Sequence, residues 1–450
     1  MLRRGRSWVA LSPRLRAPRD RDFELRSIHA VSEIMGQSHL APPTLAQVST
    51  PGFRSFSPAL QRFFVATVVN MIGSAALFAF VLVYFHEVRG IPMAQAGFAV
   101  GAMSFTMVLA TPLAGSLSDR FGARRMLAVG CLVSIVAGGA YGFVDSFAAA
   151  VSVSVLIGIG NALWFPSQAA LLTLIVPTEQ RPAVSAFQRA AMNLGAALGA
   201  ALGGVLVRAN TLTSFRWLFA VNIATYVVFL AVLPGLPHGR VEQRLHHERL
   251  HFGDVLRDRF FLSLLATDVA IALGFGFLWG FMPAYASELG ISKITIGILF
   301  AFGAASVVLT QIPTLRWVRG RPRMRSLAIM NAWFFAASVL MVMTAHTSIA
   351  VAIVAIGVAQ VLGGFGEAVL GAVRQPLTSD LAPPELVGRY FGLATMVFQV
   401  CIGLAVTIGG LVMQHSLTAV WLVPLAASAG GVLGSLALSR RIPAQVAISA

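Results

Sequence analysis

From about residue 60 onward, the chain alternates long apolar runs with short polar connections. Each run is close to the ~20 residues that an α-helix needs to cross the hydrocarbon core of a bilayer. Because lipid leaves backbone hydrogen-bonding groups unsatisfied, runs of this length favour helices over strands or loops. The pattern predicts an all-α fold with twelve membrane helices, at about 60–85, 92–116, 124–144, 147–174, 183–207, 212–234, 260–286, 293–315, 324–344, 347–373, 388–412 and 417–438.

Composition agrees with a chain that lies in the lipid bilayer. Hydrophobic residues make up 57% and charged residues only 11%, and the mean hydropathy is +0.79. These values lie far outside the range of soluble globular proteins. In a soluble protein the net charge of +16 would suggest a nucleic-acid partner. Here the basic residues gather between apolar runs, so they indicate topology and not nucleic-acid binding.

Basic residues also predict which ends of the helices face the cytoplasm. If both termini lie inside, 21 basic residues beyond the first fifty positions fall on the cytoplasmic side. Only four then fall outside, namely Arg89, Arg208, Arg216 and Lys293. The sequence therefore predicts a multi-pass protein of the plasma or inner membrane, with both termini in the cytoplasm.

Three segments fall outside the predicted helices. Residues 1–57 mix many arginines with acids and contain no apolar core of a signal peptide, which favours a disordered cytoplasmic tail. A start codon assigned too far upstream, with the true start near Met35, is the alternative. Residues 235–258 are expected to be a cytoplasmic linker between an N-terminal half, 58–234, and a C-terminal half, 259–442. Residues 443–450 are expected to be a short cytoplasmic tail.

A charged turn separates the second and third predicted helices. Gly122 permits the positive φ of a tight reversal, and Asp119 lies where a helix ends and can accept backbone N–H groups. The fixed positions of the turn are Gly115, Asp119, Arg120, Gly122, Arg124 and Arg125. Their spacing resembles the signature loop of the major facilitator superfamily of secondary transporters. The alternative is an ordinary arginine-bearing connection between membrane helices.

That resemblance implies twelve helices in two pseudo-symmetric six-helix halves, which rock about a central cavity in alternating access. An internal repeat agrees with it: an offset of 206 residues aligns Pro177 with Pro383 and Gly203 and Gly204 with Gly409 and Gly410. Parallel repeats of this kind are found in such transporters. The second copy of the turn keeps Gly320 and basic charge but has no aspartate.

Nothing in the sequence indicates catalysis. His246 and His247 lack partners at metal-ligand spacing, and Cys131 and Cys401 fall inside apolar runs. A nucleotide-binding Gly-Lys-Ser/Thr loop is also absent, and the chain contains a single lysine. We therefore expect that the protein is not an enzyme and that it binds neither a metal ion nor a cofactor. Transport energy is expected from an ion gradient or from the gradient of the substrate.

Charged side chains inside the predicted helices are the main candidates for proton binding or for contact with the cavity. Asp268 and Glu367 lie well inside the seventh and tenth helices, where a carboxylate costs about 2.5–3.5 kcal/mol on insertion scales. Burial favours the neutral form of a carboxyl group, so either could load a proton. The resemblance places helices 1, 4, 7 and 10 around the cavity. The alternative for either acid is a structural hydrogen bond, for example to Arg374.

Two further polar residues belong with these candidates. Helix 1 carries no acid and offers only Asn70, unlike several proton-coupled exporters of the family. Arg189 lies six residues inside helix 5, where it could pair with an anion in the cavity. Snorkelling of its side chain to the membrane surface is the alternative.

Helix 5 carries glycines at Gly195, Gly199, Gly203 and Gly204. Small residues at this spacing form a flat face on which a neighbouring helix can pack closely. The pattern resembles the antiporter motif of drug/proton exporters, whose core is G-P-x-x-G-G. Ala200 stands at the proline position of that motif, so close packing alone is the alternative.

Aromatic residues of helices 4 and 7 are candidates for contact with an apolar or aromatic substrate. They are Trp164, Phe165, Trp279, Phe281 and Tyr285. Several lie near the ends of predicted helices, where aromatic belts are common, so that a role at the membrane interface is the alternative.

Three functions are compatible with these features. The first is proton-coupled export of a lipophilic or cationic small molecule, with the proton as coupling ion. The second is proton-coupled transport of a specific metabolite. The third is a receptor-like membrane protein that transports nothing, although the sequence lacks the large cytoplasmic domain that would favour it. The resemblance implies a monomer.

Overall fold

The computed structural model describes residues 53–177, 180–236, 255–383 and 386–449. Twelve helical segments of this part of the chain are long and apolar enough to cross a membrane. They correspond in order to the twelve predicted helices, which confirms the all-α fold class. Most of the expected tail and linker, including Met35, His246 and His247, lies outside the described residues.

The N-terminal half contains the first six spans. Its elements are α2 (Pro58–Val83), η2 (Tyr84–Val88), α3 (Met93–Phe121), α4 (Ala123–Ala140), α5 (Phe147–Ile175), α6 (Arg181–Leu206) and α7 (Leu212–Val232). Short 3-10 turns accompany them at η1 (Phe53–Ser55), η3 (Tyr141–Phe143) and η5 (Leu233–Gly235). Serine or threonine caps begin α2, α5 and α7 by accepting backbone N–H groups of the first turn.

The C-terminal half repeats this arrangement. Its elements are α9 (Arg259–Phe275), η6 (Gly276–Phe281), α10 (Met282–Glu288), α11 (Lys293–Val318), α12 (Arg323–Thr344), α13 (Ile349–Val369), η7 (Leu370–Arg374), α14 (Gln375–Leu381), α15 (Val387–Met413) and α16 (Leu422–Leu438). Short 3-10 turns follow at η8 (Ala419–Trp421) and η9 (Ala444–Val446).

Three spans, the first, seventh and tenth, contain a π-helical turn. These turns are η2, η6 and η7. A π-helical turn rotates the side chains that follow it and is frequent at functional sites. Trp279 lies inside η6, and Glu367 lies just before η7.

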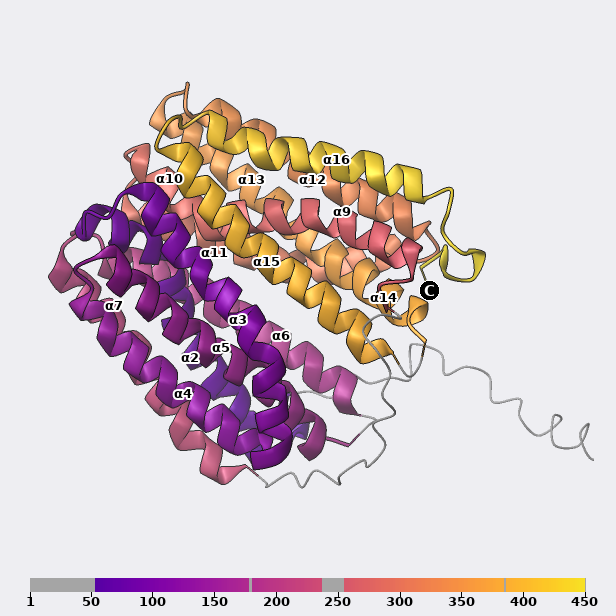
Figure 1. Cartoon of the computed structure of the whole chain (residues 1–450), viewed down its shortest axis with the longest axis horizontal. Helices are drawn as coiled ribbons and strands as arrows, with labels where there is room; N and C mark the ends of the chain where they lie inside the picture. Colours follow the sequence, from indigo (N-terminus) through magenta and orange to yellow (C-terminus); the bar gives the residue numbers. More distant parts are fainter. Residues whose placement is uncertain (1–52, 178–179, 237–254, 384–385, 450) are drawn as a thin grey trace, which may run out of the picture. The chain divides into compact units, whose positions relative to one another are not determined.

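The two halves meet mainly through α3 against α15 and α6 against α11 (Figure 1). A Cβ atom at Gly97 would lie 2.7 Å from the Val406 carbonyl oxygen, and one at Gly410 would lie 2.6 Å from the Met93 carbonyl oxygen. At the related contact, Gly297 approaches the Ala200 carbonyl oxygen to 2.5 Å by the same measure. Only glycine allows backbones this close.

The halves separate toward the other end of the bundle. Cβ atoms built at Gly115, Gly388 and Gly392 would meet no atom of the described residues within 4 Å. We name this the hinge end, because it contains the hinge segment 115–125, and we name the opposite end the Glu87 end. The close glycine contacts lie toward the Glu87 end.

Both ends of the described chain pack against the bundle. Phe56, which the prediction assigns to the tail, is buried and packs edge-to-face on Phe64 and Phe187. The segment after α16 pairs with the α11–α12 connection, where the Gly320 N–H donates to the Ser449 carbonyl at 2.9 Å. It therefore covers the second-half counterpart of the hinge segment.

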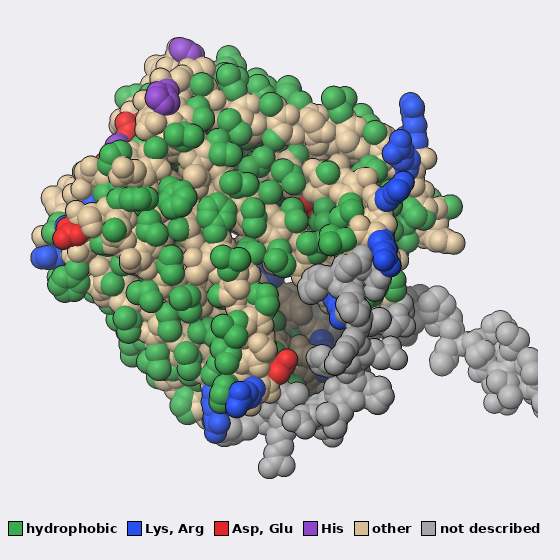
Figure 2. Space-filling model, in the orientation of Figure 1, with side chains coloured by type: hydrophobic (Ala, Val, Ile, Leu, Met, Phe, Trp, Pro, Cys, Tyr) green, Lys and Arg blue, Asp and Glu red, His purple; other side chains and the backbone are tan. Residues whose placement is uncertain are grey.

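Charge separates along the bundle. Figure 2 shows hydrophobic side chains along its sides and Lys and Arg side chains mainly at one end. The connections α3–α4 and α11–α12, which carry several arginines, lie at the hinge end. The apolar sides match the hydrocarbon region of a bilayer.

Candidate functional site

A cavity lies between the two halves in two contiguous compartments. The inner compartment has a volume of about 350 Å³ and the outer one about 660 Å³. Both are lined by Phe165, Asn193, Phe275 and Glu367, which join them. The outer compartment continues to Val176 and Arg181, between α5 and α6 at the hinge end. These volumes are typical of small-molecule sites.

Aromatic side chains from both halves form much of the inner wall. They are Phe78, Tyr141, Trp164, Phe165, Tyr226, Phe275, Trp279 and Phe300. Polar groups among them are few, and include Ser74, Asn161, Asn193 and Gln399. Glu367 is the only acid among the described residues that line either compartment.

Glu367 lies near the end of α13, in the wall of the cavity that the C-terminal half forms. Within the described part of the chain its carboxylate makes no hydrogen bond or ion pair, but it interacts electrostatically with Arg189. Arg189 comes from α6 of the other half and donates from Nη2 to Gln375 Oε1 at 3.3 Å. Its guanidinium lies over Gly371, where a Cβ atom would be 2.8 Å from Nη1. The cavity therefore brings one acid and one base from opposite halves into the same space.

Asp268 has a different environment, away from the lining residues of the cavity. Arg374 Nε lies 2.7 Å from Asp268 Oδ1, and Arg374 Nη2 lies 2.5 Å from Oδ2. Both side chains are buried, and Arg374 also bonds Thr378. This bidentate ion pair corresponds to the structural alternative given in the sequence analysis. The planar guanidinium group presents two N–H donors side by side, which favours bidentate contact with a carboxylate.

Asn70 is fully buried in α2, beside the lining residue Met71. Its amide has no hydrogen-bond partner among the described residues. The glycines of α6 also face away from the cavity: Gly195 lies against Val68, Gly199 against Ile72 and Gly203 against Ala76 of α2, while Gly204 lies against α11. Their observed contacts are thus packing contacts.

Three of the five candidate aromatics line the cavity, namely Trp164, Phe165 and Trp279. Phe281 and Tyr285 do not. Phe281 packs on Gly409, and Tyr285 hydrogen-bonds Thr344 at 2.7 Å. Phe281 lies two residues and Tyr285 six residues after Trp279, so both project from other sides of the helix.

Sequence reasoning missed several lining residues, including Phe78, Phe275, Phe300 and Gln399. Phe275 could have been found, because it lies four residues before Trp279 on the same helical face. Their ring centroids are 5.8 Å apart.

At the hinge segment, α3 ends at Phe121, and its C-cap Gly122 has a φ of +90°. Arg124 donates from Nη1 to the Leu236 carbonyl at 2.9 Å, which ties the segment to the end of α7. Arg120 lies over the Phe121 ring, 5.3 Å from its centroid. Asp119 makes no hydrogen bond or ion pair with the residues that the structure describes.

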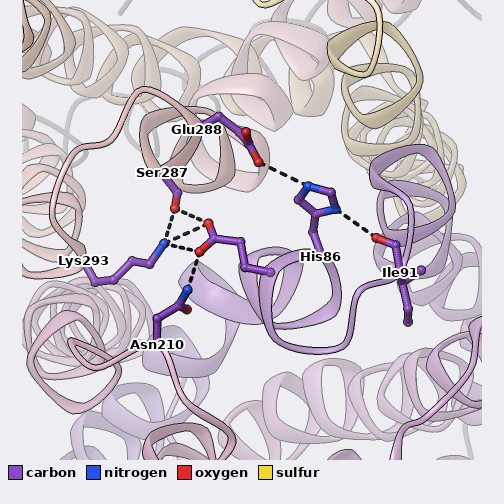
Figure 3. A network of polar contacts seen from close by, with 7 residues as sticks. His86, Ile91, Asn210, Ser287, Glu288 and Lys293 are labelled. Carbon is purple, nitrogen blue, oxygen red and sulfur yellow. Dashed lines mark hydrogen bonds and ion pairs between the residues drawn. The ribbon is translucent and has the colours of Figure 1, made fainter.

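The Glu87 end is closed by a polar network that the sequence did not predict (Figure 3). Lys293, the single lysine of the chain, lies 2.7 Å from Glu87 Oε2 across the two halves. Asn210 donates to the same carboxylate at 2.6 Å, and Ser287 also bonds it. Beside it, His86 Nε2 lies 3.2 Å from Glu288 Oε1. The described residues contain no cluster of His, Cys, Asp or Glu suited to a metal ion.

Comparison with known proteins points to one family. The model described as "Major Facilitator Superfamily" matches residues 63–406 and 264–449. Multidrug resistance protein MdtH of Aeromonas salmonicida is 24% identical over 75% of this chain and 83% of its own length. The crystal structure of a mutant of the nucleoside transporter NupG has a TM-score of 0.71 at 11% identity, over 84% of this chain and 99% of that one. A D-xylose-proton symporter structure gives 0.70 at 15% identity, over 86% and 99%.

Proposed function

Since the chain belongs to the Major Facilitator Superfamily and is a membrane transporter, not an enzyme, we propose that it exports lipophilic or cationic small molecules in exchange for protons. The observation that carries this proposal is the aromatic cavity, in which Glu367 is the single acid among the described lining residues. Aromatic faces attract both apolar groups and cations. A carboxylate in apolar surroundings can exchange a proton for a substrate cation.

The conformation supports a cycle of alternating access. The cavity is closed at the Glu87 end and extends to the hinge end. The excess of arginines there supports a cytoplasmic hinge end and cytoplasmic termini, so this conformation would load substrate from the cytoplasm. We also propose that the protein functions as a monomer in the plasma or inner membrane. Residues 235–258 are proposed to be the linker between the halves.

Multidrug resistance protein MdtH gives weak support for a drug-like substrate, because its identity to this chain is only 24%. A metabolite transporter is the second candidate. Arg181 and Arg189 line the outer compartment, and two arginines suit an anionic or zwitterionic substrate. The residues of the inner compartment favour the first candidate, because they contain no base.

The test is export by intact cells. We expect a pump-deficient host that expresses the chain to tolerate lipophilic cations better than the host alone. A proton uncoupler should remove this tolerance. Unchanged tolerance and unchanged accumulation across a broad panel of lipophilic cations would contradict the proposal. Proton-dependent flux of an anionic metabolite in the same cells would favour the second candidate.

A second prediction concerns the hinge. We propose that Asp119 bridges to the start of α15, near Gly388 and Arg389, when the hinge end closes. Asp119→Asn should then slow transport by about three- to tenfold, because it weakens one state of the cycle. The measurement is initial flux in proteoliposomes at equal protein content. Asp145→Asn, an exposed aspartate between α4 and α5, is the control; equal flux in the two variants would remove Asp119 from the cycle.

A further inference from the structure

At the Glu87 end, the ring of His86 has oxygen acceptors on both sides (Figure 3). Nδ1 lies 2.9 Å from the backbone carbonyl oxygen of Ile91. Nε2 lies 3.2 Å from Oε1 of Glu288, which belongs to α10 of the other half. The imidazole therefore sits between a carbonyl of its own half and a carboxylate of the opposite half.

The two contacts of the His86 ring together require two protons. A carbonyl oxygen can only accept, so Nδ1 must carry a proton to make the contact with Ile91. The contact between Nε2 and Glu288 then needs a second proton, on either the imidazole or the carboxylate. A neutral histidine beside an ionised glutamate holds only one. The closed arrangement thus needs one proton more than a neutral imidazole beside an ionised carboxylate supplies.

Two of the neighbouring cations have other partners. Lys293 forms an ion pair with Glu87. Arg89 donates hydrogen bonds to the Tyr84 hydroxyl and to the Gly142 carbonyl. Arg208 lines the surface depression that Glu87 and Glu288 share with Lys293. His415, on the neighbouring α15 connection, contacts Gln414. The first turn of α3, residues 93–96, contains no titratable side chain.

We propose that His86 and Glu288 form a proton-binding latch that holds the Glu87 end closed, separate from Glu367 in the cavity. Opening this end separates the two side chains, since they belong to opposite halves, and releases the shared proton to the adjacent medium. Acidification on this side stabilises the closed conformation. Because one proton is linked, the ratio of closed to open molecules changes by at most about tenfold per pH unit.

The latch has a consequence for the direction of the cycle. With the Glu87 end facing outward, as proposed above, outside acidity would favour the return of the carrier to the conformation that loads from the cytoplasm. The inference itself rests on the contacts at the Glu87 end and not on the identity of any substrate.

Distance measurement between spin labels tests the latch without a substrate. Ala148→Cys and Ser348→Cys place labels on exposed starts of α5 and α13, one in each half. Cys131 and Cys401 are replaced by alanine, and Glu367→Gln removes the cavity acid as a source of pH response. We expect the fraction of molecules with the longer distance to rise about three- to tenfold between about pH 5.5 and pH 8.

Two variants locate the response. His86→Gln should reduce the change to less than about twofold over the same range, and Glu288→Gln should do the same if the first variant folds poorly. His346→Gln is the matched control, because His346 contacts Thr418 within one half, at 2.8 Å. A full response in His86→Gln or Glu288→Gln, or the absence of any response in the parent, would overturn the latch.

Discussion

Replacing Glu367 with glutamine is expected to reduce proton-driven transport to about one tenth of the wild-type rate or less, while substrate binding survives. Glutamine keeps the size and hydrogen-bonding capacity of a protonated glutamate but cannot release a proton. Glu367 is the single acid among the described residues that line the cavity, so no other lining carboxylate can take its place. Arg189 stays near the site and keeps its bond to Gln375.

The measurement is flux in proteoliposomes with an imposed proton gradient, together with equilibrium binding of the same substrate. Glu367→Asp is the matched control: it keeps the carboxyl group with one methylene less and should retain more coupled flux than the glutamine variant. Wild-type coupled flux in Glu367→Gln would refute the role of Glu367. Loss of binding together with loss of membrane insertion would instead indicate a structural role.

The second large effect is expected at Asp268. Asp268→Asn removes the carboxylate that neutralises Arg374, whose side chain is only 5% exposed. Removing one partner of a buried ion pair typically costs about 3–5 kcal/mol, because the remaining charge stays buried without compensation. We therefore expect Asp268→Asn to lower folded yield and thermal stability markedly, whether or not transport survives.

A double variant separates a structural role from a functional one. Asp268→Leu combined with Arg374→Met removes both charges and keeps similar volume, so it should recover most of the lost stability. Thermal unfolding in detergent, followed by tryptophan fluorescence, measures both variants. The exposed Asp145→Asn is the control and should change stability by less than about 0.5 kcal/mol. Equal stability of Asp268→Asn and wild type would contradict the structural account.

The sequence by itself determined the class of the protein and the order of its helices. Length and hydropathy are enough for this, since a bilayer imposes one thickness on every span and permits only helices there. The hinge segment 115–125 could also be found from the sequence, because its glycines and charges act within a few residues of one another. The offset of 206 residues aligns Gly204 with Gly410, and the structure places both glycines at contacts between the halves.

Only the tertiary structure decided which acid faces the cavity. Asp268 and Glu367 look equivalent in sequence, since each is a single carboxylate in a long apolar run. Their environments differ because helix packing places Asp268 against Arg374 of η7, while Glu367 lines the cavity. Asp268 meets Arg374 across 106 residues of sequence, and Glu87 meets Lys293 across 206. Pairings of that separation arise when helices dock, and no local pattern in the chain specifies them.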